Sequence, residues 1–100
     1  MLVIRYFGRQ VEGFLSELPP KFRALIRSDL ELVAEHGFGA PVSARTIAGH
    51  SPMWELRNGG YRTFFFVHEG TLWVLGACKK QDQKRAIDVS ADRMKQVRGK

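Results

Sequence analysis

The chain has 100 residues, of which 44% are hydrophobic and 26% charged, and its formal net charge is +6. This length favours one domain over residues 1–100, and no stretch approaches the roughly 18 uninterrupted apolar residues of a membrane-spanning helix. The first residues lack the basic start and long apolar region of a signal peptide, so we expect a cytoplasmic protein without a membrane partner.

The positive charge lies mostly in the second half of the chain. Residues 1–50 carry six Lys/Arg against five Asp/Glu, whereas residues 51–100 carry ten against five. This asymmetry favours a polyanionic partner such as nucleic acid, although many small basic domains bind none. The single cysteine, Cys78, excludes an intrachain disulfide and is expected to be buried in a strand. No histidine has metal-ligand spacing to another ligand residue, so no metal or other cofactor is expected.

The first half of the chain reads as a strand, a helical hairpin and a second strand. Gly8 ends the first alternating stretch, and Pro19-Pro20 separates two stretches whose apolar residues recur at helical spacing. The predicted elements are a strand at residues 2–7, helices at 9–18 and 20–36, a loop at 38–43 and a strand at 44–48.

The second half is dominated by strand patterns. Turn residues at Asn58-Gly59-Gly60 and Glu69-Gly70 interrupt a nearly continuous apolar stretch, which predicts three consecutive antiparallel strands. We expect these strands at residues 53–57, 61–68 and 71–79, followed by a polar basic linker at 81–85 and a helix at about 86–98. The fold class is therefore α+β, with a short N-terminal strand, a helical hairpin, an antiparallel sheet of three to four further strands and a C-terminal helix.

The turn positions also determine which charged side chains share a face of the sheet. A first turn with two central residues places Arg57 and Arg62 on the same face, whereas a three-residue turn would separate them. If the second turn is Glu69-Gly70, residue 62 pairs with residue 77, and Lys79 lies diagonal to Arg62 on that face. Three cations this close repel each other unless an anion joins them. The pattern therefore predicts a phosphate site at one end of the sheet.

These residue types suit RNA cleavage without a metal ion. Attack by the RNA 2′-hydroxyl needs a proton acceptor, cations that stabilise the phosphorane and a donor for the leaving oxygen. Arg57 and Arg62 suit the phosphate role because a guanidinium stays charged and can bind two oxygens at once, and Lys79 or Lys80 suits proton transfer. Truncating Arg62, which follows a turn, is expected to cost little packing. The alternative is that Arg57 pairs with Glu55 and the lysines are solvated strand-end residues.

Several motifs together resemble a known family. FLSELPPKFR, EHGFGAPV, MWELRNGGYRTFFFVHEG, LGACKKQDQK and the late Ala91-Asp92-Arg93 are similar to the phage-derived Gp49-like, HigB-like branch of the RelE toxin superfamily. The resemblance covers nearly the whole chain and implies a RelE-like fold. It also implies the toxin of a type II toxin–antitoxin system, an RNase that cleaves mRNA in the ribosomal A site. A cognate antitoxin, often with a helix-turn-helix domain, would neutralise it.

The resemblance and the charge pattern together nominate eight site residues. The catalytic candidates are Arg57, Arg62, Lys79 and Lys80, and the substrate-binding candidates are Lys84, Arg85, Tyr61 and Arg93. Tyr61 would stack on a base or donate a proton, or else belong to the core or its rim. The alternative to an mRNA endonuclease is a noncatalytic RelE-like protein that only binds RNA, the ribosome or a protein partner.

Overall fold

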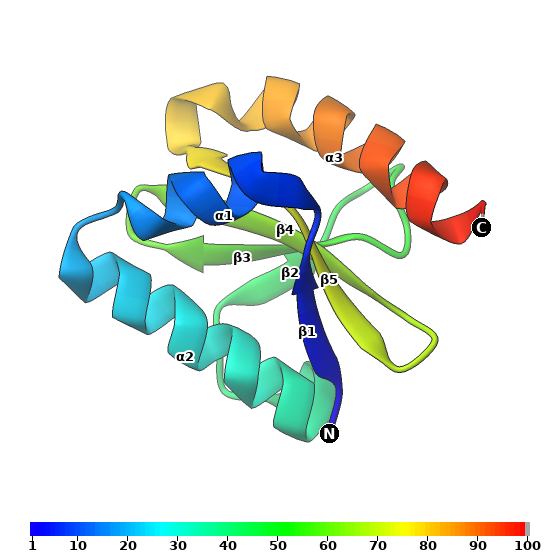
Figure 1. Ribbon diagram of the computed structural model, residues 1–100, viewed down its shortest axis with the longest axis horizontal. Coiled ribbons are helices and arrows are strands. Elements are labelled where there is room, and N and C mark those ends of the chain that lie inside the picture. Colours follow the sequence, from blue (N-terminus) through cyan, green and yellow to red (C-terminus); the bar gives the residue numbers. More distant parts are fainter. Residues whose placement is uncertain (100) are drawn as a thin grey trace.

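The computed structural model describes residues 1–99, which form a five-stranded sheet with helices on both faces (Figure 1). The elements in chain order are β1 (Val3–Tyr6), α1 (Gly8–Ser16), α2 (Pro20–His36), the 3₁₀ turn η1 (Gly37–Gly39), β2 (Ala44–Thr46), β3 (Trp54–Asn58), β4 (Tyr61–His68), β5 (Thr71–Lys79), the 3₁₀ turn η2 (Lys80–Asp82) and α3 (Gln83–Arg98). The strand order is β1-β5-β4-β3-β2. The predicted α+β class is confirmed, and the sheet is mixed because β1 runs parallel to β5 while the other pairs are antiparallel.

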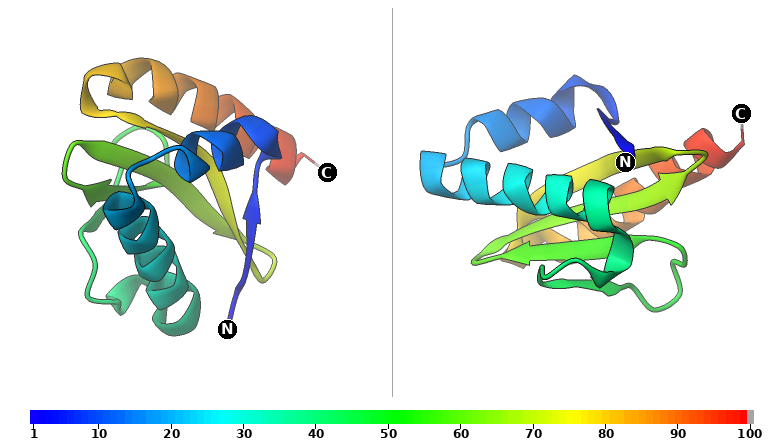
Figure 2. Two further views of the ribbon diagram at one scale, coloured as in Figure 1. Left: turned by 60° about the vertical axis from the view of Figure 1, so that its left-hand side comes forward. Right: turned by 90° about the horizontal axis from the view of Figure 1, so that it is seen from below.

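The helical hairpin of α1 and α2 covers one face of the sheet, as Figure 2 shows. Gly8 leads from β1 into α1 with a positive φ of 78°, which favours glycine. Pro20 occupies the first turn of α2, and Gly37 caps its end, as its position predicts. The apolar core on this face includes Val11, Leu15, Ile26, Leu30, Val33, Leu56, Phe65, Leu72 and Val74.

The helix α3 covers the opposite face of the sheet (Figure 2). Its buried residues Ala91, Met94 and Val97 pack in one core with Phe64 and Phe66 of β4. Because successive side chains of a strand point to opposite faces, the central phenylalanine of the run, Phe65, joins the core under the hairpin instead. Among residues 1–99, no helix is long and apolar enough to cross a membrane.

The register of β4 and β5 differs from the prediction. Phe65 pairs with Val74 as the turn position requires, but the register then shifts, and Phe64 pairs with Gly76. This β-bulge inserts Leu75 as an extra residue, so every pair beyond it moves by one position. Lys79 therefore pairs with Tyr61 and does not lie diagonal to Arg62 as predicted. Its side chain projects to the face of the sheet that the helical hairpin covers.

The segment predicted as a linker is helical. Residues 81–85 form most of η2 and the first turn of α3, which begins at Gln83 rather than near residue 86. The polar residues of this segment do not face the apolar core, so hydrophobic periodicity misses them. The Gln83 side chain instead donates a hydrogen bond to Glu55 of β3 and so attaches the first turn of α3 to the sheet.

Candidate anion-binding site

A buried carboxylate surrounded by arginines lies on the α3 side of β2, β3 and β4. Glu55 has no exposed surface, and its Oε2 accepts hydrogen bonds from Arg57 Nε at 3.0 Å and Arg45 Nε at 3.1 Å. Arg62 Nε lies 3.8 Å from Oε1 of the same carboxylate. We call these four residues the arginine cluster. Three guanidinium groups share one carboxylate, so the cluster keeps two positive charges without a partner inside it.

Strand pairing brings the members of the arginine cluster together. The turn between β3 and β4 has two central residues, so Arg57 and Arg62 are paired across the two strands and share a face, as predicted. Glu55 lies two residues before Arg57 on that face, and Arg45 of β2 is paired with Glu55. The pairing of Arg57 with Glu55, the alternative to a phosphate role, is therefore present in the free protein.

The three arginines differ in how freely they can move. The Arg62 side chain is 7% exposed, and its Nη1 donates hydrogen bonds to the carbonyls of Gly59 at 2.8 Å and Tyr61 at 2.9 Å. The expectation that truncating Arg62 costs little packing is therefore wrong, because the side chain is buried and holds the turn. The side chains of Arg57 and Arg45 are 36% and 61% exposed, so both are accessible to an anion from solution.

The start of α3 adds positive potential near the arginine cluster. The contact between Gln83 and Glu55 fixes the N-terminus of α3 there, where the helix dipole places a partial positive charge, with Asp82 at the N-cap. Lys80 in η2 and Lys84 in the first turn of α3 are both exposed. The backbone N–H of Lys80 donates to the carbonyl of Gly60 at 2.8 Å, which places Lys80 at the β3–β4 turn.

The remaining candidate residues lie elsewhere. Lys79 is exposed on the opposite face of the sheet from the arginine cluster. Tyr61 shares that opposite face and packs edge-on against Phe22 of α2, with ring centroids 4.9 Å apart. Arg85 and Arg93 line a separate pocket between α1, β5 and α3. The structure thus brings together only the two arginines among the eight candidates, with Lys80 and Lys84 on the segment beside them.

Two members of the site were missed from the sequence, and a third was named only as an alternative partner. Arg45 is in a three-residue strand whose register has no turn signal beside it, so its pairing with Glu55 could not be read locally. Gln83 fell in a segment predicted to be a linker. The available signal for Glu55 was its spacing, because a carboxylate two residues before an arginine in a strand shares the face of that arginine.

The lone cysteine adjoins the site but does not suit nucleophilic chemistry. Cys78 is buried, as predicted, and is paired across the strands with Arg62. Burial, with a smaller contribution from the charge of Asp82, raises the pKa of the Cys78 thiol to about 11, so the thiol stays protonated near neutral pH. Within residues 1–99, no three His, Cys, Asp or Glu side chains are grouped so that they could hold a metal ion.

The fold is that of the RelE toxins. The structure superposes on the E. coli toxin RelE in the free state, in a variant with two arginines replaced by alanine. The TM-score is 0.72, with 15% identity over 92% of this chain and 96% of that chain. The RelB–RelE antitoxin–toxin complex of Methanococcus jannaschii gives a TM-score of 0.67 and 14% identity over 84% of this chain and 96% of that chain. The archaeal RelE–RelB complex of Pyrococcus horikoshii OT3 gives a TM-score of 0.62 and 16% identity over 79% of this chain and 94% of that chain.

The sequence match identifies a narrower family than the structural matches do. Residues 13–95 match the family described as phage derived protein Gp49-like (DUF891), so the chain belongs to the Gp49-like family. No curated protein matches the chain in sequence.

Proposed function

We propose that this protein is the toxin of a type II toxin–antitoxin system and that it cleaves mRNA on the ribosome without a metal ion. The arginine cluster carries the proposal, because it holds two positive charges beyond those that Glu55 neutralises and presents them on a RelE-like fold. A phosphodiester that becomes a dianionic phosphorane during attack by the 2′-hydroxyl is the anion such a cluster stabilises.

The three arginines take different roles in this proposal. Arg57 and Arg45, with exposed guanidinium groups, bind the scissile phosphate. The guanidinium of Arg62 donates hydrogen bonds to two backbone carbonyls and so contributes a fixed positive charge beside the two exposed arginines. Lys80, at the β3–β4 turn, is better placed for proton transfer than Lys79, which projects from the other face.

The proposed partner is a cognate antitoxin, with a helix-turn-helix domain in the branch that this sequence resembles. Two structures with the same fold are of antitoxin–toxin complexes. We expect the antitoxin to cover or distort the basic end of the sheet, which would keep RNA from the arginine cluster, or to bind the helical hairpin on the opposite face of the sheet. The toxin would act in the cytoplasm, where its ribosomal target is.

The test uses Arg57→Ala, with Arg5→Ala on the exposed part of β1 as the matched control. Arg57 is preferable to Arg62 because, among residues 1–99, its side chain bonds only to Glu55. Glu55 keeps its bonds from Arg45 and Gln83 in the variant, so the fold should stay intact. We expect the Arg57 variant to lose growth arrest in cells without antitoxin and to cleave ribosome-bound mRNA on the order of 10²-fold more slowly, with the control unchanged. Full toxicity in folded Arg57→Ala and in Lys79→Ala/Lys80→Ala would contradict the catalytic assignment.

A second candidate function is binding of RNA or the ribosome without cleavage. It is favoured by one feature of the free structure. All three arginines already bond to or lie beside Glu55, and across residues 1–99 no lysine or histidine forms a hydrogen bond or ion pair with the arginine cluster. Under this alternative, the wild type would sediment with ribosomes and leave mRNA intact, and Arg57→Ala would lose the ribosome association.

A further inference from the structure

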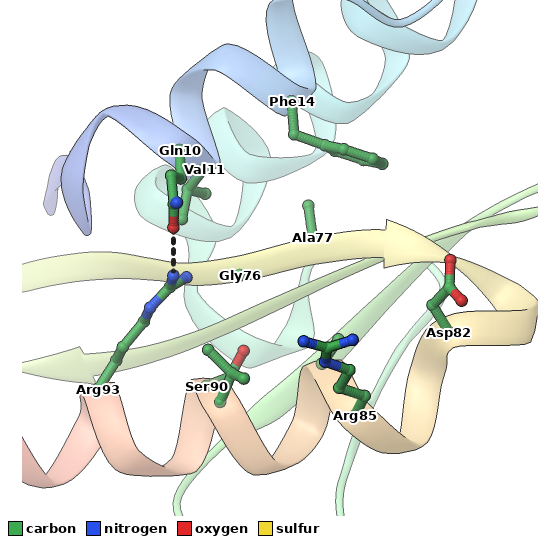
Figure 3. A pocket seen from close by; sticks show the side chains of 11 residues that line it. Gln10, Val11, Phe14, Gly76, Ala77, Asp82, Arg85, Ser90 and Arg93 are labelled. Atoms are coloured by element: carbon green, nitrogen blue, oxygen red, sulfur yellow. Dashed lines mark hydrogen bonds between the residues drawn. The ribbon is translucent and has the colours of Figure 1, made fainter.

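A groove separate from the arginine cluster runs along β5 between α1 and α3 (Figure 3). Its volume is about 420 Å³, and the floor is formed by Gly76 and Ala77. At one end, Arg93 Nη2 donates a hydrogen bond to Gln10 Oε1 at 3.2 Å and so joins the two helices. Residues lining the rest of the groove include Phe14, Asp82, Arg85, Ala86, Val89 and Ser90.

The groove exists because β5 extends beyond its neighbour β1. The last β1–β5 pair is Tyr6 with Val74, after which the N–H of Phe7 donates to the carbonyl of Val74 at 2.9 Å. The chain then leaves the sheet at Gly8 to begin α1, whereas β5 continues to Lys79. In the part of the chain that the structure describes, the second half of β5 therefore has β4 on one side and no strand on the other.

The open edge presents backbone groups to the groove. In this half of β5, Gly76 is paired with Phe64 and Cys78 with Arg62, and the N–H of Lys80 bonds to Gly60. Antiparallel hydrogen bonds involve alternate residues, so the N–H and C=O of the intervening Ala77 point away from β4. Across residues 1–99, no hydrogen bond to Ala77 forms on that side.

One backbone group of the same edge already has a side-chain partner. The carbonyl of Leu75 accepts a hydrogen bond from Arg93 Nη1 at 2.7 Å. Unpaired strand edges of this kind are templates for another strand unless they are covered. At Ala77, within the described residues, no side chain bonds to the edge and no strand pairs with it.

The walls of the groove indicate what chemistry would fill it. Val89 is 40% exposed and Phe14 is half-buried, so the walls present apolar surface. Arg85 is exposed and, among the described residues, forms no ion pair, and Lys79 at the end of β5 is exposed too. Asp82 lines the groove as well, so with Arg85 and Arg93 the lining side chains carry a net charge of +1. A strand edge with apolar walls and this positive balance matches an extended acidic peptide better than RNA, because RNA cannot supply the alternating N–H and C=O groups of a strand.

We propose that this groove binds an extended acidic peptide segment, which adds to the sheet as a sixth strand beside residues 75–79 and bonds to the N–H and C=O of Ala77. The identity of that segment as part of the antitoxin rests on the proposed toxin function. The peptide chemistry rests only on the groove.

The probe is the acetylated, amidated pentapeptide Glu-Val-Thr-Val-Glu, titrated into isotope-labelled protein and followed by backbone amide NMR. We expect the largest shifts at residues 75–79 and slower hydrogen exchange at the Ala77 amide. N-methylation of the central peptide residue should weaken binding at least about tenfold, because it removes a backbone donor. The counterpart Lys-Val-Thr-Val-Lys should bind several-fold more weakly, because it reverses the charge.

Val89→Glu tests the location, because it puts a negative charge on the groove wall at an exposed position and should leave the fold intact. The matched control is Val3→Glu on β1, which is exposed and outside the groove. The Glu-Val-Thr-Val-Glu peptide should bind the Val89 variant at least several-fold more weakly and the control as it binds the wild type.

Three outcomes would overturn the groove proposal: amide shifts confined to other surfaces, equal binding of the N-methylated peptide, or a single-stranded oligouridine that shifts the Ala77 amide where the peptide does not. Failure of the toxin assignment is distinguishable. If Arg57→Ala behaves as wild type while the peptide binds at Ala77, the groove stands and the activity does not. If Arg57→Ala loses cleavage and the peptide fails to bind, only the groove proposal falls.

Discussion

Glu55 organises the charged residues that define the candidate site. Burying one carboxylate is costly unless hydrogen bonds compensate it. Arg45, Arg57 and Gln83 donate such bonds to Glu55, and Arg62 adds an ion pair at 3.8 Å. The same contacts hold the guanidinium groups in place before any substrate arrives. Such preorganisation is useful in a phosphate site, because fixed charges need not reorganise as the reaction proceeds.

Cys78, which adjoins this site, gives a prediction about how the free energy of unfolding depends on pH. The raised pKa of Cys78, to about 11, means that the folded state keeps the thiol proton at a pH where the unfolded chain has lost it. The stability that Cys78 contributes is therefore complete below the ordinary thiol pKa and is lost as the pH rises through about 11. Cys78→Ala should show a shallower decline in the free energy of unfolding over that range, measured by urea denaturation.

A thiol reagent checks the same group directly. At pH 8 the folded protein should react with iodoacetamide far more slowly than the protein in denaturant, because the thiol is buried and protonated. Equal rates in the folded and unfolded protein would contradict the assignment of an inert cysteine.

At the scale of elements, the contact between β5 and α3 depends on Gly76, which has no side chain. A Cβ on Gly76 would overlap the hydroxyl of Ser90, which is fully buried and has no hydrogen-bond partner among residues 1–99. The helix can therefore lie directly on the bulged part of β5.

This contact predicts a strong coupling between two substitutions. Gly76→Ala should lower the free energy of unfolding by about 1–3 kcal/mol, because α3 must shift. Ser90→Ala should be close to neutral, because it removes an unsatisfied buried hydroxyl. In the double variant the overlap disappears, so most of the loss should be recovered in a double-mutant cycle measured by denaturant unfolding. Additive losses would show that the overlap does not control the packing of α3.

The elements that could be predicted from sequence are those with local signals. Helical spacing and Pro19-Pro20 defined the hairpin, and the two-residue turn before Tyr61 was enough to place Arg57 and Arg62 on one face. The bulge at Leu75 has no such signal, because LWVLGAC is apolar in either register, and its position depends on how α3 packs over Gly76. Lys79 was misplaced for this reason.

The contacts of Arg45 and Gln83 required tertiary information. Each reaches Glu55 from a segment distant in sequence, through a short strand or the first turn of a helix. Neither segment has the apolar periodicity from which its position could be read. The parallel pairing of β1 with β5 likewise joins the two ends of the fold and has no local pattern.

At the scale of the whole molecule, the sheet separates two surfaces that the proposals assign to different partners. The arginine cluster lies at the β3–β4 turn, and the groove lies along the open edge of β5, while α3 contacts both through Gln83 and Ser90. The net charge of +6 favours the approach of RNA to the protein as a whole. In the proposed function, the arginine cluster is where the phosphate would be held.

Binding of an anion at the arginine cluster should stabilise the entire fold. Inorganic pyrophosphate that binds the native state adds RT ln(1 + [L]/Kd) to the free energy of unfolding, about 1.4 kcal/mol at ten times Kd, or a rise of roughly 6–11 °C in Tm for a domain of this size. The rise should exceed that in sodium chloride of equal ionic strength. It should shrink in Arg57→Ala, which removes an exposed guanidinium, and persist in Arg5→Ala. Calorimetry measures all three proteins without requiring activity, and an equal rise in the two variants would locate the anion outside the arginine cluster.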